Sequence, residues 1–328
     1  MRGHLFPLLA ALPLLGCPLA GQARTLVVGA GAEYANLTLA ARLAVDGDTI
    51  RLMPGEYFEC VSLPQNQLLL DGQGATLTDR TCEGKALLVL QGNGTTVRDL
   101  TLARARVPDG NGAGIRLEGQ GLLLERVRFE NDQIGLLGGP EGPGAVRIIG
   151  CTFEGGGVGG PRALAAVVVG AVALLRIQGS VFQGGKGGQV LSAASRTELE
   201  DNRIAGGLEA DGPPAVSVSG DTLLMRGNTV TLGPEAPARS AAVLMSGTRA
   251  ELRGNRLENK TGRPMTLLLD WSASSPVLEG NVLAAGDTLS STAGSWRHRA
   301  GAAARTVKSG VREAAGAVKR SMLGMLNW

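Results

Sequence analysis

One motif returns along this chain at nearly constant spacing. The segment VRIIGCTF has counterparts of the same pattern before and after it, and successive copies end 22 to 29 residues apart. The copies end at Leu102, Phe129, Phe153, Phe182, Ile204, Val230, Leu257 and Leu283. A repeat period of about 20 to 50 residues is typical of stacked architectures, in which each unit packs only on its neighbours. The chain is therefore predicted to be a solenoid.

Alternation of apolar and polar residues within each copy predicts short strands with one side facing inward. The predicted inward column is Leu124, Ile148, Ile177, Leu199, Met225, Leu252 and Leu278. A second strand line precedes each copy, with inward pairs at Ile115/Leu117, Ile134/Leu136, Val167/Val169, Val216/Val218, Val243/Met245 and Leu267/Leu269. No segment between the strands is long and periodic enough for a helix. Each coil should be strand, turn, strand and loop, which defines an all-β, parallel β-helix.

A turn position lies two residues before the end of each copy. Its occupants are Cys151, Ser180, Asn202, Asn228, Asn255 and Asn281. Consecutive asparagines stacked at the strand spacing of about 4.8 Å can bond amide to amide. We therefore interpret these four asparagines as a structural ladder and not as catalytic residues.

The first 23 residues have the features of a targeting signal. Arg2 and His4 form a basic region, Leu5–Leu15 an apolar core too short to span a bilayer, and GQA at 21–23 a small-residue cleavage site. The protein is expected to be exported, to the periplasm or the cell exterior. In a second interpretation, Leu15-Gly16-Cys17 is a lipoprotein cleavage box that leaves a lipid on Cys17.

Three cysteines lie beyond Cys17. Cys60 and Cys82 are 22 residues apart, about one coil, so they can lie on adjacent coils and form a disulfide in an oxidising compartment. Cys151 occupies the inward turn column and is expected to be a free, buried thiol.

The body begins with VGAGAEY, which imitates a dinucleotide-binding fingerprint but has Tyr34 in place of its third glycine. We instead expect Asn36 to cap a helix that runs through Val45 and closes the open end of the first coil.

The segment GAGAEYANLTLAARLAVDGDTIRLMPGEY resembles the start of bacterial right-handed parallel β-helix proteins of the pectate-lyase-like superfamily. There a capping helix is followed by a GDTI-x-(I/L)-x-PG-x-Y first coil. The resemblance covers residues 24–290, which we take as one β-helix domain. It implies a right-handed helix, and an acidic polysaccharide as the partner.

The segment DGNGAGIR at 109–116 also resembles a subgroup that carries histidines before the strand matching Val167–Val169, and a later His-x-x-Ile-Lys-Ser-Arg segment. This chain reads AAVVVG and GQVLSAAS there and keeps only Ser192, so its copy of that motif is degenerate. The only histidines of the chain are His4 and His298. Two routes known in the superfamily remain, one with calcium and an Arg or Lys base, the other with Lys and Arg alone. No column of stacked Asp or Glu supports calcium, so we expect no metal or other cofactor.

The insertion between Leu102 and Ile115 is the best candidate site, because long loops on rigid scaffolds often carry function. Its candidate catalytic residues are Arg106, Asp109 and Arg116, and its candidate substrate-binding residues are Arg104 and Asn111. Arginine suits bidentate contacts with uronate carboxylates. In the alternative interpretation, these charges only hold the loop to the scaffold.

Three weaker candidates lie elsewhere. Lys186 and Arg162 fall on loops near the altered motif, and Trp271 could stack on a sugar ring or simply cover apolar coils. The outward columns of the repeat mostly alternate in sign between coils, as in Arg98/Glu125, Glu200/Arg226 and Arg253/Glu279. We interpret this face as a structural charge ladder. With the net charge of the body near −3, no nucleic-acid groove is expected.

The C-terminal tail, 291–328, differs from the body, because from Trp296 onward it has seven Lys or Arg against Glu313 alone. One helical face carries Val307, Val311, Val318, Met322 and Leu326. Three interpretations remain: a cap on the solenoid, a membrane-surface helix, or a basic tether. Apolar residues that we place outward on the second strand line, Val168, Leu244 and Leu268, also need a cover.

The sequence thus predicts a monomeric, exported β-helix that binds an acidic polysaccharide and could process it by lyase or epimerase chemistry without histidine. The alternative is a non-catalytic structural or interaction protein of the cell surface or periplasm, which the missing histidines favour.

Overall fold

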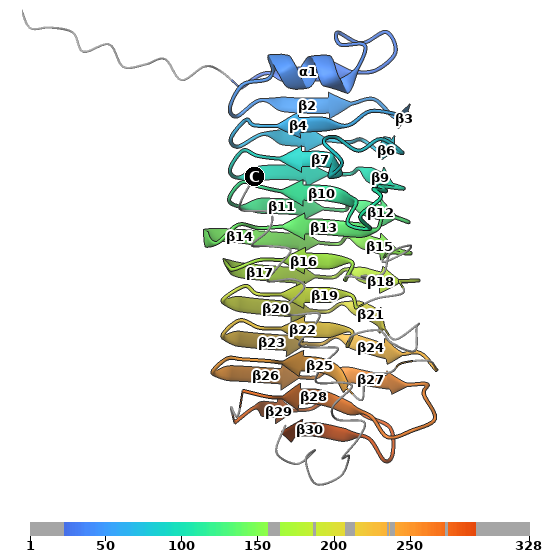
Figure 1. Cartoon of the computed structure of the whole chain (residues 1–328), viewed down its shortest axis with the longest axis vertical. Helices are drawn as coiled ribbons and strands as arrows, with labels where there is room; N and C mark the ends of the chain where they lie inside the picture. Colours follow the sequence, from blue (N-terminus) through green and yellow to red (C-terminus); the bar gives the residue numbers. More distant parts are fainter. Residues whose placement is uncertain are drawn as a thin grey trace, which may run out of the picture.

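The chain forms a parallel β-solenoid of three sheets, shown in Figure 1. This computed structural model describes residues 23–156, 165–185, 188–206, 214–234, 236, 240–272 and 275–292. The predicted signal segment and nearly all of the predicted tail lie outside the described residues. The predicted all-β solenoid is confirmed, with one short helix.

Sheet A contains the strands that precede the asparagine turn. Its strands, in spatial order, are β1 (Thr25–Val28), β2 (Thr49–Leu52), β5 (Leu69–Asp71), β8 (Thr95–Arg98), β11 (Leu122–Glu125), β14 (Gly142–Ile149), β17 (Val172–Gln178), β20 (Arg196–Glu200), β23 (Thr222–Arg226), β26 (Arg249–Arg253) and β29 (Val277–Glu279). The predicted inward column is in register from Leu124 to Leu278, and all of its members except Leu278 are fully buried.

Sheet B contains the residues at which the repeats end. Its strands are β3 (Glu56–Tyr57), β6 (Thr76–Thr78), β9 (Thr101–Ala103), β12 (Arg128–Glu130), β15 (Thr152–Glu154), β18 (Val181–Gln183), β21 (Arg203–Gly206), β24 (Thr229–Leu232) and β27 (Arg256–Asn259). Phe153 stacks between Phe129 and Phe182 with ring centroids 4.6 Å apart on each side. A coil therefore has three strands and not the two predicted. The third was missed because it is only two to four residues long and follows sheet A after a single turn.

Sheet C is the second predicted strand line. Its strands are β4 (Val61–Leu63), β7 (Ala86–Leu90), β10 (Ala113–Leu117), β13 (Ile134–Gly138), β16 (Val167–Val169), β19 (Val190–Ser192), β22 (Val216–Val218), β25 (Ser240–Leu244), β28 (Thr266–Asp270) and β30 (Thr288–Thr292).

The inward residues of β25 and β28 differ from the prediction. Ala242, Leu244 and Leu268 pair with core residues of neighbouring coils and belong to the main core, so Val243 and Leu269 face outward. The prediction was therefore wrong at Val243, Leu244, Leu268 and Leu269, whereas Leu267 belongs to the main core as predicted. The error arose because every residue of both strands is buried and the sequence shows no alternation there.

The helix α1 (Leu37–Leu43) lies over the first coil, beside β2 in Figure 1. Asn36 caps it as predicted, and Leu37, Ala40 and Ala41 are buried against the coil below. The helix ends at Leu43, two residues earlier than expected, where Ala44 becomes extended. The apolar end of the solenoid is thereby covered.

Candidate functional site

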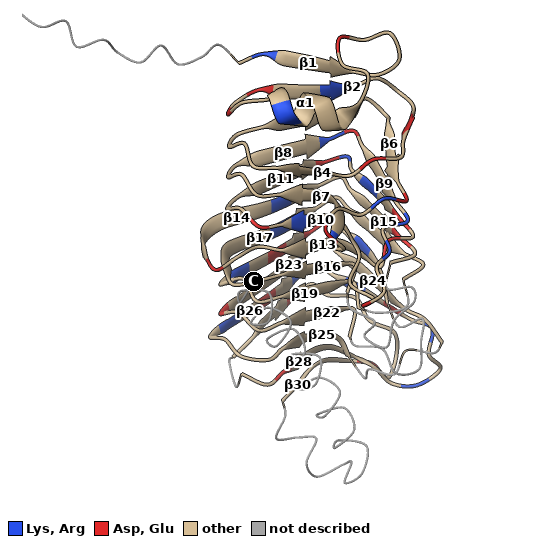
Figure 2. Cartoon of the chain, turned by 45° about the horizontal axis from the view of Figure 1, so that its top comes forward, with Lys and Arg blue, Asp and Glu red and all other residues tan. Residues whose placement is uncertain are grey.

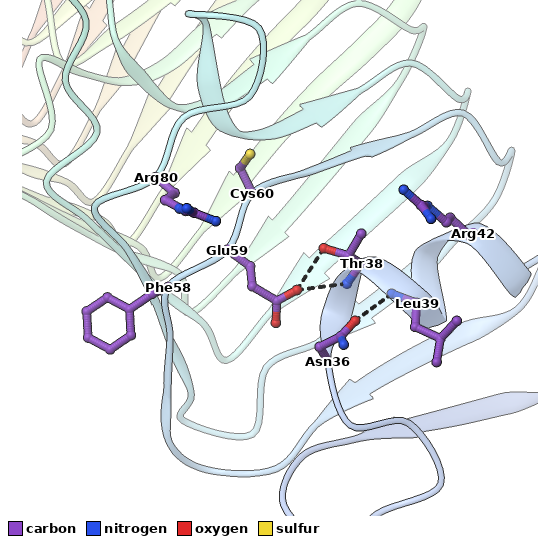
Figure 3. A pocket seen from close by; sticks show the side chains of 8 residues that line it. All are labelled: Asn36, Thr38, Leu39, Arg42, Phe58, Glu59, Cys60 and Arg80. Carbon is purple, nitrogen blue, oxygen red and sulfur yellow. Dashed lines mark hydrogen bonds between the residues drawn. The ribbon is translucent and has the colours of Figure 1, made fainter.

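A depression of about 840 Å³ lies where α1 meets the segment between sheets B and C of the first coil (Figure 3). It is lined by Asn36, Thr38, Leu39, Arg42, Phe58, Glu59, Cys60 and Arg80. These residues come from the helix, from the residues just before β4 and from the turn after β6.

The floor of the depression is held by hydrogen bonds to the start of α1. The carboxylate of Glu59 accepts from the backbone N–H groups of Leu37 (3.1 Å) and Thr38 (3.0 Å), and from Oγ1 of Thr38 (2.7 Å). Oδ1 of Asn36 accepts from the N–H of Leu39 at 2.8 Å. The first backbone N–H groups of the helix thus already have hydrogen-bond acceptors, and Glu59 holds the start of α1 in place beside the depression.

A disulfide joins Cys60 to Cys82, with the two Cα atoms 5.4 Å apart, and Cys151 is free and buried. Both predictions about the cysteines are confirmed. The bridge connects the wall that carries Phe58 and Glu59 to the turn that carries Arg80, so the lining is covalently tied across one coil. Such a bond is typical of proteins that mature in an oxidising compartment.

Two arginines face the depression from opposite sides. Arg42 lies in the last turn of α1, Arg80 follows β6, and Figure 3 shows both side chains reaching inward. Both residues are exposed, and neither forms an ion pair with any other residue in the described part of the chain. Two unpaired guanidinium groups around one hollow are suited to an anion with planar acceptor oxygens.

The rim of the depression also carries exposed apolar groups. Phe58 is 55% exposed and Leu39 is 43% exposed, although both side chains are large and hydrophobic. Aromatic rings exposed beside polar groups provide the flat apolar surface on which a sugar ring can stack.

The predicted site in the 104–116 loop is arranged differently. Nε and Nη2 of Arg104 each donate to the carboxylate of Asp79 at 2.7 Å, so this arginine is bound to the preceding coil. Arg106 and Asp109 are exposed, and Asn111 is half-buried.

Arg116 lies on the outward side of β10, and its side chain is only 13% exposed. Its Nε is 4.0 Å from Oε1 of Glu118, and burial lowers the pKa of this guanidinium. Arg104 and Arg116 therefore have separate partners on different corners of the coil, and they do not converge on one ligand.

The loop itself is pinned by two residues that sequence analysis did not select. Oε1 of Gln133 accepts from the N–H groups of Val107 (2.9 Å) and Gly112 (2.7 Å), and Asp132 accepts from the N–H of Ala105 at 2.7 Å. Burial raises the pKa of Asp132 well above its usual range, against the lowering effects of that hydrogen bond and of Arg106. These contacts favour the scaffold interpretation of the loop.

The remaining candidates are distant or outside the described residues. Lys186 and Arg162 lie outside them. Trp271 directly follows β28 near the other end of the solenoid, where it is half-buried and its backbone N–H donates to the carbonyl of Leu244 at 2.9 Å. It cannot contribute to the depression beside α1.

The outward face of sheet A is an ion-pair ladder. Arg226 contacts Glu200 (3.8 Å) and Arg253 contacts Glu279, as the sequence predicts. Arg226 also contacts Glu251 (3.1 Å), a pair that was not predicted. Arg98 pairs with Asp71 at 3.0 Å, whereas the sequence predicted Glu125, since the shorter Asp71 carboxylate is fully buried and needs a cation.

Glu251 has the strongest cationic surroundings in this ladder. Its carboxylate accepts from Arg226, Arg249 and Arg253, and these hydrogen bonds, with that of Arg253 first, lower its pKa to about 2. Figure 2 shows both charge signs interleaved along this flank. Most charges on this face pair with one another, and no cluster of unpaired charges remains among its described residues.

No group of three or more His, Cys, Asp or Glu side chains suited to a metal ion occurs within the described ranges. The single helix described is too short to cross a membrane.

Fold and site together define a parallel β-solenoid capped at one end by a short helix, with a basic depression beside the cap. Compared with protein-family models, with curated proteins and with solved structures, the chain matches none of them.

Proposed function

We propose that this protein is exported and binds an acidic polysaccharide at the depression beside α1. The observation that supports this proposal is the pair Arg42 and Arg80, two exposed guanidinium groups without an acidic partner in the described chain, on opposite sides of one hollow. A uronate carboxylate would bind between them, and the exposed ring of Phe58 would stack on a neighbouring sugar.

The proposal is for binding and not for lyase or epimerase chemistry. Glu59 is the only carboxylate among the lining residues, and its oxygens already accept hydrogen bonds from α1. The hydroxyl of nearby Tyr57 donates to the carbonyl of Met53 at 2.8 Å. The depression thus offers cations and an apolar platform, but no free acid that could exchange a proton.

The test is a titration of the protein with an oligogalacturonate and with neutral dextran. Arg42→Ala and Arg80→Ala should each weaken oligogalacturonate binding about fivefold, the effect of about 1 kcal/mol. Their melting temperatures should stay unchanged, because neither arginine has a partner to lose. Arg203→Ala is the matched control: this arginine is exposed on β21, far along the solenoid, and carries the same charge.

Two results would contradict the proposed binding site, and a third would contradict its restriction to binding. Equal weakening by Arg203→Ala would indicate non-specific attraction of a polyanion, and equal affinity for dextran would exclude carboxylate recognition. Unsaturated uronate ends released from the polymer, detected by ultraviolet absorbance, would show processing in addition to binding.

The second candidate is a non-catalytic structural protein of the cell surface. It is favoured by the pinned 104–116 loop and by the bidentate contact of Arg104 with Asp79. This alternative predicts no measurable affinity for the oligogalacturonate at any salt concentration.

A further inference from the structure

The outward side of sheet C is apolar over most of its length. From β7 to β28 one outward column contains Val89, Leu137, Val168, Leu191, Val243 and Leu269, interrupted by Arg116 and Ser217. A second outward column contains Ala86, Ala113, Ile134 and Ala165, so Ile134 faces outward and not inward as the sequence predicted. We call these residues the outer apolar face. Figure 2 shows sheet C from β13 to β25 without charged residues.

These outward side chains are nevertheless buried. Val89 is 0% exposed, Leu137 4%, Val168 2%, Val243 1% and Leu269 6%. Seven residues of the outer apolar face form a second hydrophobic cluster, separate from the core inside the solenoid. Side chains on an uncovered sheet would face water, so further atoms of the same chain must lie over this face.

We propose that the C-terminal segment 293–328 covers the outer apolar face as an amphipathic helix. The last described strand, β30, is itself a strand of sheet C and pairs with β28. The chain therefore leaves the solenoid at the edge of the face that needs a cover. Because the outer apolar face is buried within a single chain, a segment of that chain is favoured as its cover over a second copy or a membrane.

The length of the segment fits this face. From β30 to β7 there are eight strand steps, or about 38 Å at about 4.8 Å per step. The 36 residues from 293 to 328 span about 54 Å if helical, at about 1.5 Å per residue. The segment is long enough to cross the whole face, with residues left for the connection.

The side chains of the segment also fit. Val307, Val311, Val318, Met322 and Leu326 fall on one side of a helix, and its Lys and Arg residues lie mainly elsewhere. The turns at the edge of sheet C expose Glu141 and Asp221, which have the opposite charge to the segment. The apolar side of the segment thus matches the outer apolar face, and its basic residues match the acidic residues at the edge of that face.

The test compares the intact chain with Val311→Asp/Val318→Asp, which charges the apolar side of the segment. Ser309→Asp/Ala317→Asp is the matched control, with the same added charge placed outside the apolar side. We expect the first variant to bind the dye anilinonaphthalene sulfonate about threefold or more above the intact chain, because the outer apolar face is uncovered. The control should bind as little dye as the intact chain.

A chain ending at Thr292 provides a second measurement. It should bind the dye strongly, and adding the 293–328 peptide in trans should reverse this. Unchanged dye binding in the first variant, or equal dye binding by both double variants, would overturn the proposal. It would also fail if anionic lipid vesicles took up the segment from the intact chain without raising dye binding, which would make the segment a membrane-surface helix.

Discussion

The side-chain amide of Asn228 donates a hydrogen bond to Oδ1 of Asn255 over 2.9 Å, while Oδ1 of Asn228 accepts from the amide of Asn202 at the same distance. Each amide also donates to a carbonyl of the coil before it, as Asn228 does to Leu199 at 2.8 Å. The predicted asparagine ladder is therefore confirmed and runs on to Asn281. It satisfies backbone groups that the turns would otherwise leave buried without partners.

Replacing Asn228 should expose the importance of the ladder. Asn228→Ala removes the side-chain hydrogen bond to the carbonyl of Leu199 and the acceptor of the backbone N–H of Asn202, in a fully buried turn. We expect a loss of about 3 kcal/mol in the free energy of unfolding, measured by chemical denaturation. Asn281→Ala is the control, since Asn281 is at the open end of the ladder and half-buried, and should cost clearly less. Equal losses at both positions would argue against a continuous ladder.

Most of the coil could be predicted from the sequence because sheet A alternates. Leu124, Ile148 and Ile177 are inward apolar residues, and each is flanked in its strand by residues that face outward and are at least partly exposed. This alternation fixes the register. Sheet C has apolar residues on both sides, and there the period-two pattern disappears. Which way Val243 and Leu269 face is set by packing between coils, and the sequence of a single strand does not reveal that packing.

The depression was not predictable in the same way. Arg42 is a helix residue, and Arg80 lies in a turn almost forty positions later. Only the stacking of the first coils and the Cys60–Cys82 bridge bring them to one hollow. By contrast, Arg104 and Arg116 looked promising because they are close in sequence, but Asp79 and Glu118 hold them apart.

The two kinds of cysteine should differ sharply in reactivity. Burial raises the pKa of the Cys151 thiol to about 12, so in the folded protein it should resist maleimide at pH 8. Reducing the Cys60–Cys82 bridge should add two labelled sites and cost about 3 kcal/mol, the value for a closed loop of about 22 residues. Mass spectrometry after labelling, with denatured protein as the control, counts the labelled thiols, and chemical denaturation measures the loss in stability. A labelled Cys151 in the folded state would contradict the burial.

Asp132 should make the stability depend on pH. Its raised pKa means that the folded state favours the neutral carboxyl group, so its stabilising contribution is complete at acidic pH and is lost as pH rises through the folded-state pKa. Between the unfolded-state pKa and the folded-state pKa the stability falls by up to about 1.4 kcal/mol per pH unit, and above the folded-state pKa it no longer changes with pH. Asp132→Asn stays neutral, so its melting temperature relative to the natural protein should be higher at pH 8 than at pH 4.

The comparison at two pH values separates titration from packing. Asn keeps the acceptor for the N–H of Ala105, and the second carboxyl oxygen of Asp132 has no hydrogen-bond partner to lose. Glu130→Gln, at a half-buried carboxylate that ends β12 and pairs with Arg128, is the control for removing a nearby negative charge. A constant difference in melting temperature at both pH values would mean that Asp132 is ionised in the folded protein throughout.

Arg116 offers a direct test of the scaffold interpretation of the 104–116 loop. It stands in the outward column between Val89 and Leu137, nearly buried, with its nearest carboxylate at 4.0 Å. Glu118 keeps Lys85 as a partner at 3.1 Å. Replacing a desolvated, poorly paired cation by an apolar side chain is often neutral or stabilising. Arg116→Leu should therefore keep or raise the free energy of unfolding by about 1 kcal/mol.

Arg104→Leu is the matched variant, because it removes a guanidinium that makes two 2.7 Å hydrogen bonds to Asp79. It should lower the melting temperature, whereas Arg116→Leu should not. Neither should change affinity for an oligogalacturonate if the ligand binds beside α1. Loss of binding in both variants, with stability unchanged, would return the site to this loop and remove the depression as the primary candidate.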